Sequence, residues 1–96
     1  MTSMITAKHI DKEQVAWLYF PEDEVLVSTK TMEKRSLEVQ KAAILCNTEN
    51  INMHIIFEDS EGLKRVETGI WTVTSKRIIL NDGATIPINR IHEIKI

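Results

Sequence analysis

Residues 78–88 have the sequence Ile78-Ile79-Leu80-Asn81-Asp82-Gly83-Ala84-Thr85-Ile86-Pro87-Ile88. Two short runs rich in β-branched residues flank a turn signal, and the second run contains a proline that limits its length. The pair Asp82-Gly83 supplies residues that tolerate positive φ, which a two-residue primed turn requires. The stretch therefore predicts a tight β-hairpin inside a small, mainly β unit.

The composition is that of one globular domain. The chain has 96 residues, which is enough for one hydrophobic core and too few for two. Hydrophobic residues make up 43% and the formal net charge is −2, values that argue against disorder and against strong non-specific binding of nucleic acid. We therefore expect residues 1–96 to form a single domain.

The sequence also bears on location. No apolar run approaches the roughly 20 residues needed to cross a bilayer. Residues 1–9 lack the basic start and the long apolar stretch of a secretory signal. The single cysteine, Cys46, cannot form an internal disulfide, which agrees with a reducing compartment. We expect a cytoplasmic protein with no membrane partner.

The amino-terminal segment, residues 1–30, has the weakest pattern. Asp11 and Gln14 resemble a capping box and predict a short helix over residues 11–19, although the aromatic-rich run 15–20 is also compatible with a strand. We favour the helix. Residues 24–28 form either a short strand or an extended connection, and the sequence leaves open whether the segment packs on the sheet or on the main helix.

Residues 31–46 predict that main helix, because they are rich in helix formers and contain neither glycine nor proline. Its apolar side chains fall on two faces. One stripe at helical spacing contains Met32, Val39, Ala43 and Cys46.

The second apolar face consists of Leu37 and Ile44, which lie one heptad apart on the roughly opposite side of this helix. If the first stripe covers a sheet, the second face needs another cover, since exposed apolar patches usually indicate a partner. That cover is either another subunit or, as we favour, the apolar residues of the amino-terminal segment, namely Trp17, Leu18 and Phe20.

Residues 50–96 predict strands throughout. Residues 51–58 alternate between apolar and polar side chains, with Ile56 as the exception, which gives a strand with one apolar face and one mostly polar face. A turn over residues 59–62 leads into a long run over residues 63–74, with Gly69 in its middle. A glycine in a strand pattern often marks a bulge or a sharp bend.

A bulge at Gly69 would exchange the two faces of this long strand. Val66 would then lie inward before the glycine, and Trp71 and Val73 would lie inward after it. Three further strands are expected over residues 77–80, 84–88 and 91–96, and the short gap at Asn89-Arg90 predicts a single tight turn.

This order of elements resembles the small barrels of the Sm-like and SH3-like groups. The resemblance covers residues 31–96 and rests on the helix, the long bent second strand and the corner Ile86-Pro87-Ile88-Asn89-Arg90-Ile91. It implies an α+β, mainly β fold, in which one amphipathic helix precedes a five-stranded, strongly bent antiparallel sheet that closes into a small barrel.

The Sm-like group also implies ring assembly and RNA binding. Its members usually carry an Arg-Gly pair, or in bacteria a Lys-His pair, in the hairpin between the last two strands. This chain has Ile88-Asn89-Arg90-Ile91 there instead. Because a fold alone implies no function, RNA binding does not follow from the resemblance.

A search for chemistry finds no catalytic motif. The three histidines and Cys46 show no paired spacing for a metal ion. His54 is expected to be a solvated neighbour on its strand, Cys46 a small buried hydrophobe, and the acidic run Glu22-Asp23-Glu24 a solvated turn. We therefore expect no enzyme activity, no cofactor and no metal.

Basic residues suggest one further surface. Lys76 and Arg77 would form a basic rim with Arg90 if the fold brings them together, with Trp71 as an anchoring or stacking residue. The simpler interpretation is that these charges keep strand edges from pairing.

Two functions remain. We favour a protein-interaction or self-associating module that uses Leu37 and Ile44, so that the partner is another protein or a second copy. The alternative is RNA or single-stranded nucleic-acid binding along the basic rim.

Overall fold

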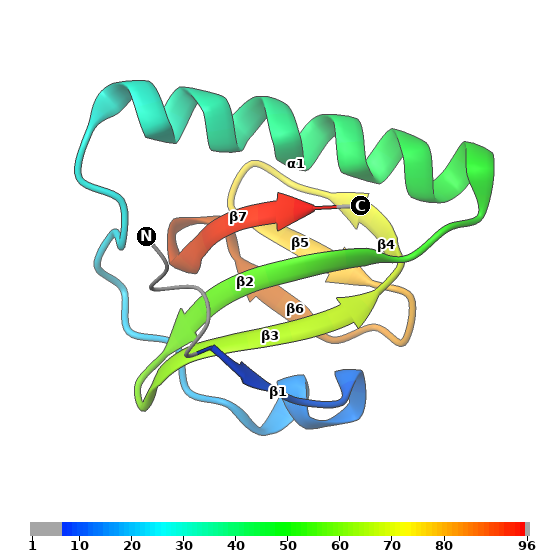
Figure 1. The fold of residues 1–96 in the computed structure, drawn as a ribbon. Helices are drawn as coiled ribbons and strands as arrows, with labels where there is room; N and C mark the ends of the chain where they lie inside the picture. Colours follow the sequence, from blue (N-terminus) through cyan, green and yellow to red (C-terminus); the bar gives the residue numbers. More distant parts are fainter. Residues whose placement is uncertain (1–6, 96) are drawn as a thin grey trace.

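The computed structural model of the chain describes residues 7–95. Its long helix, α1 (Thr29–Glu49), lies along one side of the strands, above β7 and β4 in Figure 1. Short 3-10 helices, η2 (Lys12–Trp17) and η3 (Ile88–Arg90), lie at two connections. The strands are β1 (Lys8–His9), β2 (Met53–Asp59), β3 (Gly62–Thr68), β4 (Ile70–Val73), β5 (Arg77–Leu80), β6 (Thr85–Pro87) and β7 (Ile91–Lys95).

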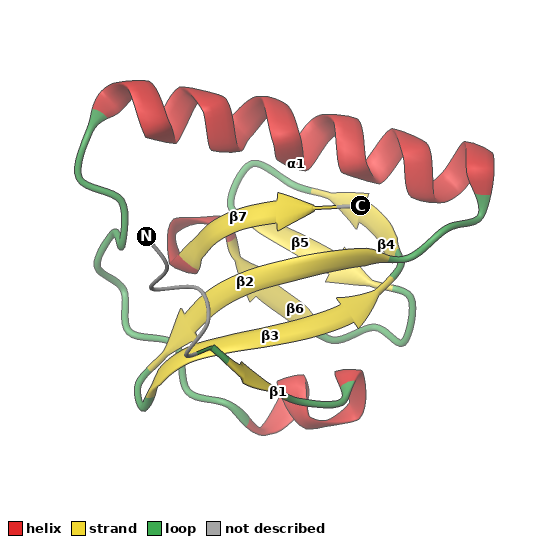
Figure 2. Cartoon of the chain, viewed as in Figure 1, coloured by secondary structure: helices red, strands yellow, loops and turns green. Residues whose placement is uncertain are grey.

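The strands form two sheets, with the orders β1-β3-β2-β7 and β4-β5-β6 (Figure 2). The prediction of a closed five-stranded barrel is therefore wrong. The two sheets are joined where the chain passes from β3 to β4, but η3 separates β6 from β7, and these two strands belong to different sheets. β6 ends at Pro87, and the amide of Ile88 makes one more hydrogen bond to β4–β5, to the carbonyl of Lys76 at 2.9 Å, before the chain turns into η3.

The predicted hairpin over residues 78–88 forms, but with a different turn. The amide of Gly83 donates to the carbonyl of Leu80 at 2.9 Å, and the amide of Leu80 donates to the carbonyl of Ala84 at 2.8 Å. In this turn only Gly83 has a positive φ, of 92°. The turn is therefore a three-residue loop with glycine at its last position, and the prediction of a two-residue primed turn is wrong.

The predicted long strand is divided at Gly69, where a Cβ atom would clash with the Asn81 side chain. The inward alternation nevertheless continues through the glycine, because Val66, Thr68 and Ile70 are all buried. The ladder with β5 shifts register between Ile70 and Thr72, which leaves Trp71 as an extra residue. The inward position predicted for Trp71 is wrong, since its side chain is 62% exposed.

Helix α1 is longer than the predicted 31–46. It begins after Ser28, whose Oγ accepts a hydrogen bond from the amide of Thr31 at 3.1 Å. It ends at Asn50, which has the left-handed angles φ 56° and ψ 44°. Its buried face packs on a core that lies between the two sheets, where the largest buried side chains include Met53, Ile55, Phe57, Ile70, Ile78, Leu80, Ile86 and Ile91.

The amino-terminal segment packs on the sheets. Its strand β1 pairs in parallel with β3, and η2 confirms a short helix in place of a strand, whereas residues 24–28 form no strand. Leu18 and Phe20 pack on the core, while Trp17 is 86% exposed. Leu37 and Ile44 are 69% and 63% exposed, so the predicted cover from within the chain is wrong.

Two earlier expectations reach beyond the described residues. A secretory signal was not expected over residues 1–9, of which residues 1–6 lie outside the described range. The last strand was expected to run to Ile96, which also lies outside it. Within residues 7–95, no helix is long and apolar enough to span a membrane.

The end of α1 gives a first prediction. A side chain with a Cβ is disfavoured in the left-handed region by about 1–2 kcal/mol, whereas glycine and, less freely, asparagine adopt it. We expect Asn50→Ala to lower the free energy of unfolding by about 1 kcal/mol and Asn50→Gly to leave it unchanged or raised. Urea denaturation measures both, and an equal loss in the two variants would contradict the assignment.

Candidate functional site

Residues 20–26 connect η2 to α1 and are here called the acidic strap, because they contain Glu22, Asp23 and Glu24. The strap lies against η3. The amide of Val25 donates to the carbonyl of Asn89 at 3.0 Å, and Nδ2 of Asn89 donates in return to the carbonyls of Glu22 and Asp23. Glu22 and Asp23 are exposed at this bend, as expected for a solvated turn, whereas Glu24 is half-buried. Two arginines bind Asp23 and Glu24.

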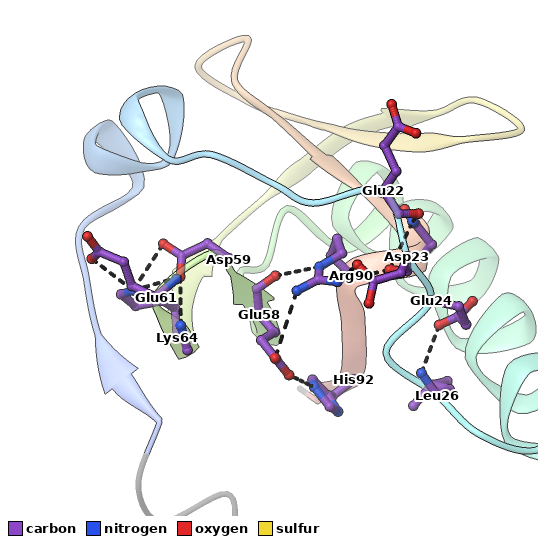
Figure 3. A network of polar contacts seen from close by, with 12 residues as sticks. Glu22, Asp23, Glu24, Leu26, Glu58, Asp59, Glu61, Lys64, Arg90 and His92 are labelled. Atoms are coloured by element: carbon purple, nitrogen blue, oxygen red, sulfur yellow. Dashed lines mark hydrogen bonds and ion pairs between the residues drawn. The ribbon is translucent and has the colours of Figure 1, made fainter.

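Arg90 is the first of these arginines. Its side chain is only 4% exposed, and its Nη1 donates to the carbonyl of Asp23 at 2.9 Å and to Oδ1 of the same residue at 3.1 Å. Its Nε donates to the carbonyl of Glu58 at 2.9 Å. Figure 3 shows Arg90 between the strap and Glu58. Arg90 therefore ties the strap to β2.

Arg35, on the buried face of α1, is the second arginine. Its two terminal nitrogens each donate to one carboxylate oxygen of Glu24 at 2.6 Å, in a bidentate pair. Nη1 also donates to the carbonyl of Ile91 at 3.1 Å. Arg35 thus joins the helix, the strap and β7 at one point.

This arrangement changes the titration of Glu24. The hydrogen bond from Arg35 is the largest influence and lowers the pKa of this carboxyl below its ordinary value of 4.5. Burial opposes the change, and a hydrogen bond from the amide of Leu26, at 2.9 Å, adds to it. Glu24 therefore stays ionised at neutral pH, and its charge balances the buried guanidinium group.

A second buried ion pair joins Asp59 and Lys64 at the β2–β3 turn, with side chains 2% and 7% exposed. Burial is the largest influence on Asp59 and raises its pKa. The hydrogen bond from Lys64, those from the amides of Glu61 and Gly62, and the charge of Lys64 together outweigh burial and lower the pKa below 3.8. Lys64 Nζ lies 2.9 Å from Oδ1 of Asp59. The pair closes the turn that the sequence placed at 59–62.

His92 belongs to the same polar network as Arg90. His92 Nε2 lies 2.9 Å from Oε1 of Glu58, which also lies near Arg90 (Figure 3). Among the described residues, no serine, threonine or cysteine hydrogen-bonds to His92, and no group of three or more side chains could hold a metal ion. The His92–Glu58 pair is therefore a polar contact at the end of the network.

An open hollow of about 590 Å³ lies beside the strap. Arg35 lines it from α1, Lys76 from the turn between β4 and β5, and Arg77 from the start of β5. We call this space the basic hollow. Its other lining residues are Phe20, Pro21, Glu22, Ser75, Pro87, Ile88 and Asn89.

The structure separates the residues proposed for a basic rim. Lys76 and Arg77 line the basic hollow and are exposed. Arg90 is buried and its guanidinium binds Asp23 and Glu58, so it does not extend the rim as an open cation. The proposed three-residue rim is reduced to two of its members.

The apolar candidates lie on and beside α1. Leu37 and Ile44 point away from the buried face of the helix, about 10 Å apart along its axis. Asn47, one turn beyond Ile44, donates through Nδ2 to the carbonyl of Trp71 at 3.1 Å. The carbonyl of Ile70 lies 3.4 Å from the same nitrogen. Asn47 therefore joins the helix to the bulge that exposes Trp71.

Two buried cations, Arg35 and Lys64, were not predicted from the sequence. Both had a signal in the pattern. Arg35 falls at helical spacing between Met32 and Val39 on the inward stripe, and Lys64 alternates in phase with Val66. A charged residue on an inward stripe predicts a buried ion pair when an acidic run is near enough to bind it.

Comparisons with protein-family models, with curated proteins and with solved structures gave no significant match to this chain. The resemblance to the Sm-like and SH3-like groups stays a prediction. The geometry of the described residues carries the functional argument.

The two acidic partners of buried cations should differ in their effect on stability. Asp59→Asn leaves the Lys64 ammonium buried beside a neutral amide, and we expect a loss of about 3 kcal/mol in the free energy of unfolding. Asp23→Asn should cost less than about 1 kcal/mol, because Asp23 is 82% exposed and Arg90 keeps its carbonyl partners. Equal losses in urea denaturation would contradict this ranking.

Stability should also depend on acidity. Glu24 and Asp59 have pKa values in the folded chain that lie below their ordinary values of about 4.5 and 3.8. As the pH falls through those ordinary values, the unfolded chain therefore binds more protons than the folded chain. Their stabilisation is complete above those values and is lost as the pH falls through the lower folded pKa values. Unfolding measured from pH 7 to pH 3 should show this loss, and Glu24→Gln should make the curve shallower, whereas the exposed control Glu33→Gln should not. A stability that rises on acidification would contradict the account.

Proposed function

We propose that this chain is a non-enzymatic protein-interaction module that binds an acidic amphipathic helix of another protein. The binding surface is the outer face of α1 together with Trp71. The observation that carries the proposal is the β-bulge that turns Trp71 outward beside the helix. Bulges re-aim side chains, and exposed tryptophan is the residue type most enriched at binding hot spots.

The outer face of α1 has an apolar centre and basic flanks. Leu37 and Ile44 lie at its centre, exposed by more than half. Three lysines and one glutamate surround them, and none of the four forms an ion pair within the described part of the chain. These charged residues are Lys30, Glu33, Lys34 and Lys41.

This charge distribution favours an acidic partner over a second copy. In a two-fold antiparallel pair of α1 helices, Leu37 would meet Ile44 of the second copy. The flank with Lys34 and Lys41 would then meet the same lysines, and like charges in contact are destabilising. A partner helix with carboxylates beside its apolar stripe would instead pair with these lysines while its stripe packs on Leu37 and Ile44.

The polar network supports binding in place of catalysis. Its charged groups are used in holding the strap and the β2–β3 turn, through Arg35, Arg90 and Lys64. The exposed candidates Leu37, Ile44 and Trp71 are apolar and suit contact with a protein surface.

Peptide display tests the proposal. A random helical-peptide library is selected on the wild-type chain and counter-selected on the Leu37→Ser/Ile44→Ser/Trp71→Ala variant. We expect enrichment of acidic sequences with apolar residues at helical spacing. Binding of the selected peptides should weaken by about tenfold or more in Trp71→Ala, as expected for a hot-spot residue.

Trp17→Ala is the matched control, because Trp17 is another exposed tryptophan that lies away from α1. Its affinity for the selected peptides should equal that of the wild type. Peptides without an acidic excess, or equal losses in the two tryptophan variants, would contradict the proposal. A dimer in light scattering that Leu37→Ser/Ile44→Ser converts to a monomer would replace the acidic partner by a second copy.

A further inference from the structure

The basic hollow lies apart from the surface of α1 proposed above, since it is bounded by the strap, the β4–β5 turn and η3. Its cationic side chains come from positions far apart in the sequence. Lys76 and Arg77 are exposed, and neither has a carboxylate partner among residues 7–95. One carboxylate, that of Glu22, also lines the hollow.

Arg35 also lines this hollow, but as a cation that already has a partner. Glu24 balances its charge, but its Nε is buried and has no hydrogen-bond partner in the described chain. The hollow therefore has two open cations, Lys76 and Arg77, and one cation whose charge Glu24 already balances.

Four of the six other lining residues are apolar. Phe20 and Pro21 come from the strap, and Pro87 and Ile88 come from the end of β6 and from η3. Phe20 is held in place by its contact with Phe57, whose ring centroid lies 5.9 Å away. The volume of about 590 Å³ falls within the range of about 300–1,000 Å³ that is usual for small-molecule sites.

We infer that the basic hollow binds a small molecule in which a phosphate is joined to a planar ring, as in a nucleoside monophosphate. The phosphate lies between Lys76 and Arg77, whose donors suit its oxygens. The ring lies on the apolar wall that Phe20 and Pro21 provide. Glu22 limits the charge of the site, so it favours a ligand with one phosphate over a long polyanion such as single-stranded nucleic acid.

The test uses amide chemical shifts and isothermal titration of the full chain. The probes are the four ribonucleoside monophosphates and phenyl phosphate, with inorganic phosphate and adenosine as half-ligands. At least one complete probe should shift the amides of residues 20, 22, 75–77 and 88–89. Each half-ligand should bind at least about tenfold more weakly than that probe.

Two neutral variants locate the phosphate. Lys76→Gln and Arg77→Gln should each weaken binding by about tenfold, because each removes a hydrogen bond to a charged group. Arg65→Gln is the matched control, since Arg65 is an exposed cation of β3 outside the hollow, and it should bind as the wild type does. All three positions are exposed, and a thermal denaturation curve for each variant verifies that it folds.

Three results would overturn the inference. The first is no shift at the hollow with any complete probe up to about 10 mM, a concentration that detects very weak binding. The second is an equal loss in Arg65→Gln and Arg77→Gln, which would indicate non-specific attraction of anions. The third is tighter binding of a single-stranded oligonucleotide than of every monophosphate by more than about tenfold, with a steep salt dependence, which would assign the surface to nucleic acid.

Discussion

The structure depends on two buried guanidinium groups that both bind one acidic segment. Arg35 and Arg90 have side chains 7% and 4% exposed, and a buried charge without a partner is strongly destabilising. Glu24 and Asp23, with the strap backbone, supply the partners. Because Arg35 belongs to α1 and Arg90 to η3, the same strap connects the helix to the strands. The acidic strap thus fixes the positions of α1 and η3 relative to each other.

The position of the strap also determines the surfaces left for binding. It runs beside η3 and supplies Phe20, Pro21 and Glu22 to the wall of the basic hollow. It does not cross the outer face of α1, so Leu37 and Ile44 stay uncovered. Both proposed sites therefore depend on the position of the strap, although their chemistry differs. The outer face of α1 is apolar with basic flanks, and the basic hollow has open cations.

Local patterns predicted much of the secondary structure. The main helix, the alternating strand before the 59–62 turn, the break at Gly69 and the tight turn at residues 88–90 all follow from spacing and turn residues. The barrel prediction failed because closure depends on whether β6 and β7 pair, which is a long-range property. The prediction that Trp71 lies inward failed because a bulge has no reliable local signature in the sequence. Arg35 and Lys64 were missed because charged residues were assumed to be solvated, although their places in the inward stripes indicated burial.

Native-state hydrogen exchange at the strap tests the central claim most directly. The amide of Val25 donates to the carbonyl of Asn89. The amide of Ser60 donates to the carbonyl of Tyr19, which lies just before the strap. If buried arginines hold the strap, the Val25 amide should exchange far more slowly than in an unstructured peptide and should lose this protection in Arg90→Met. Exchange of the Val25 amide at the unstructured rate in the wild-type chain would contradict the account.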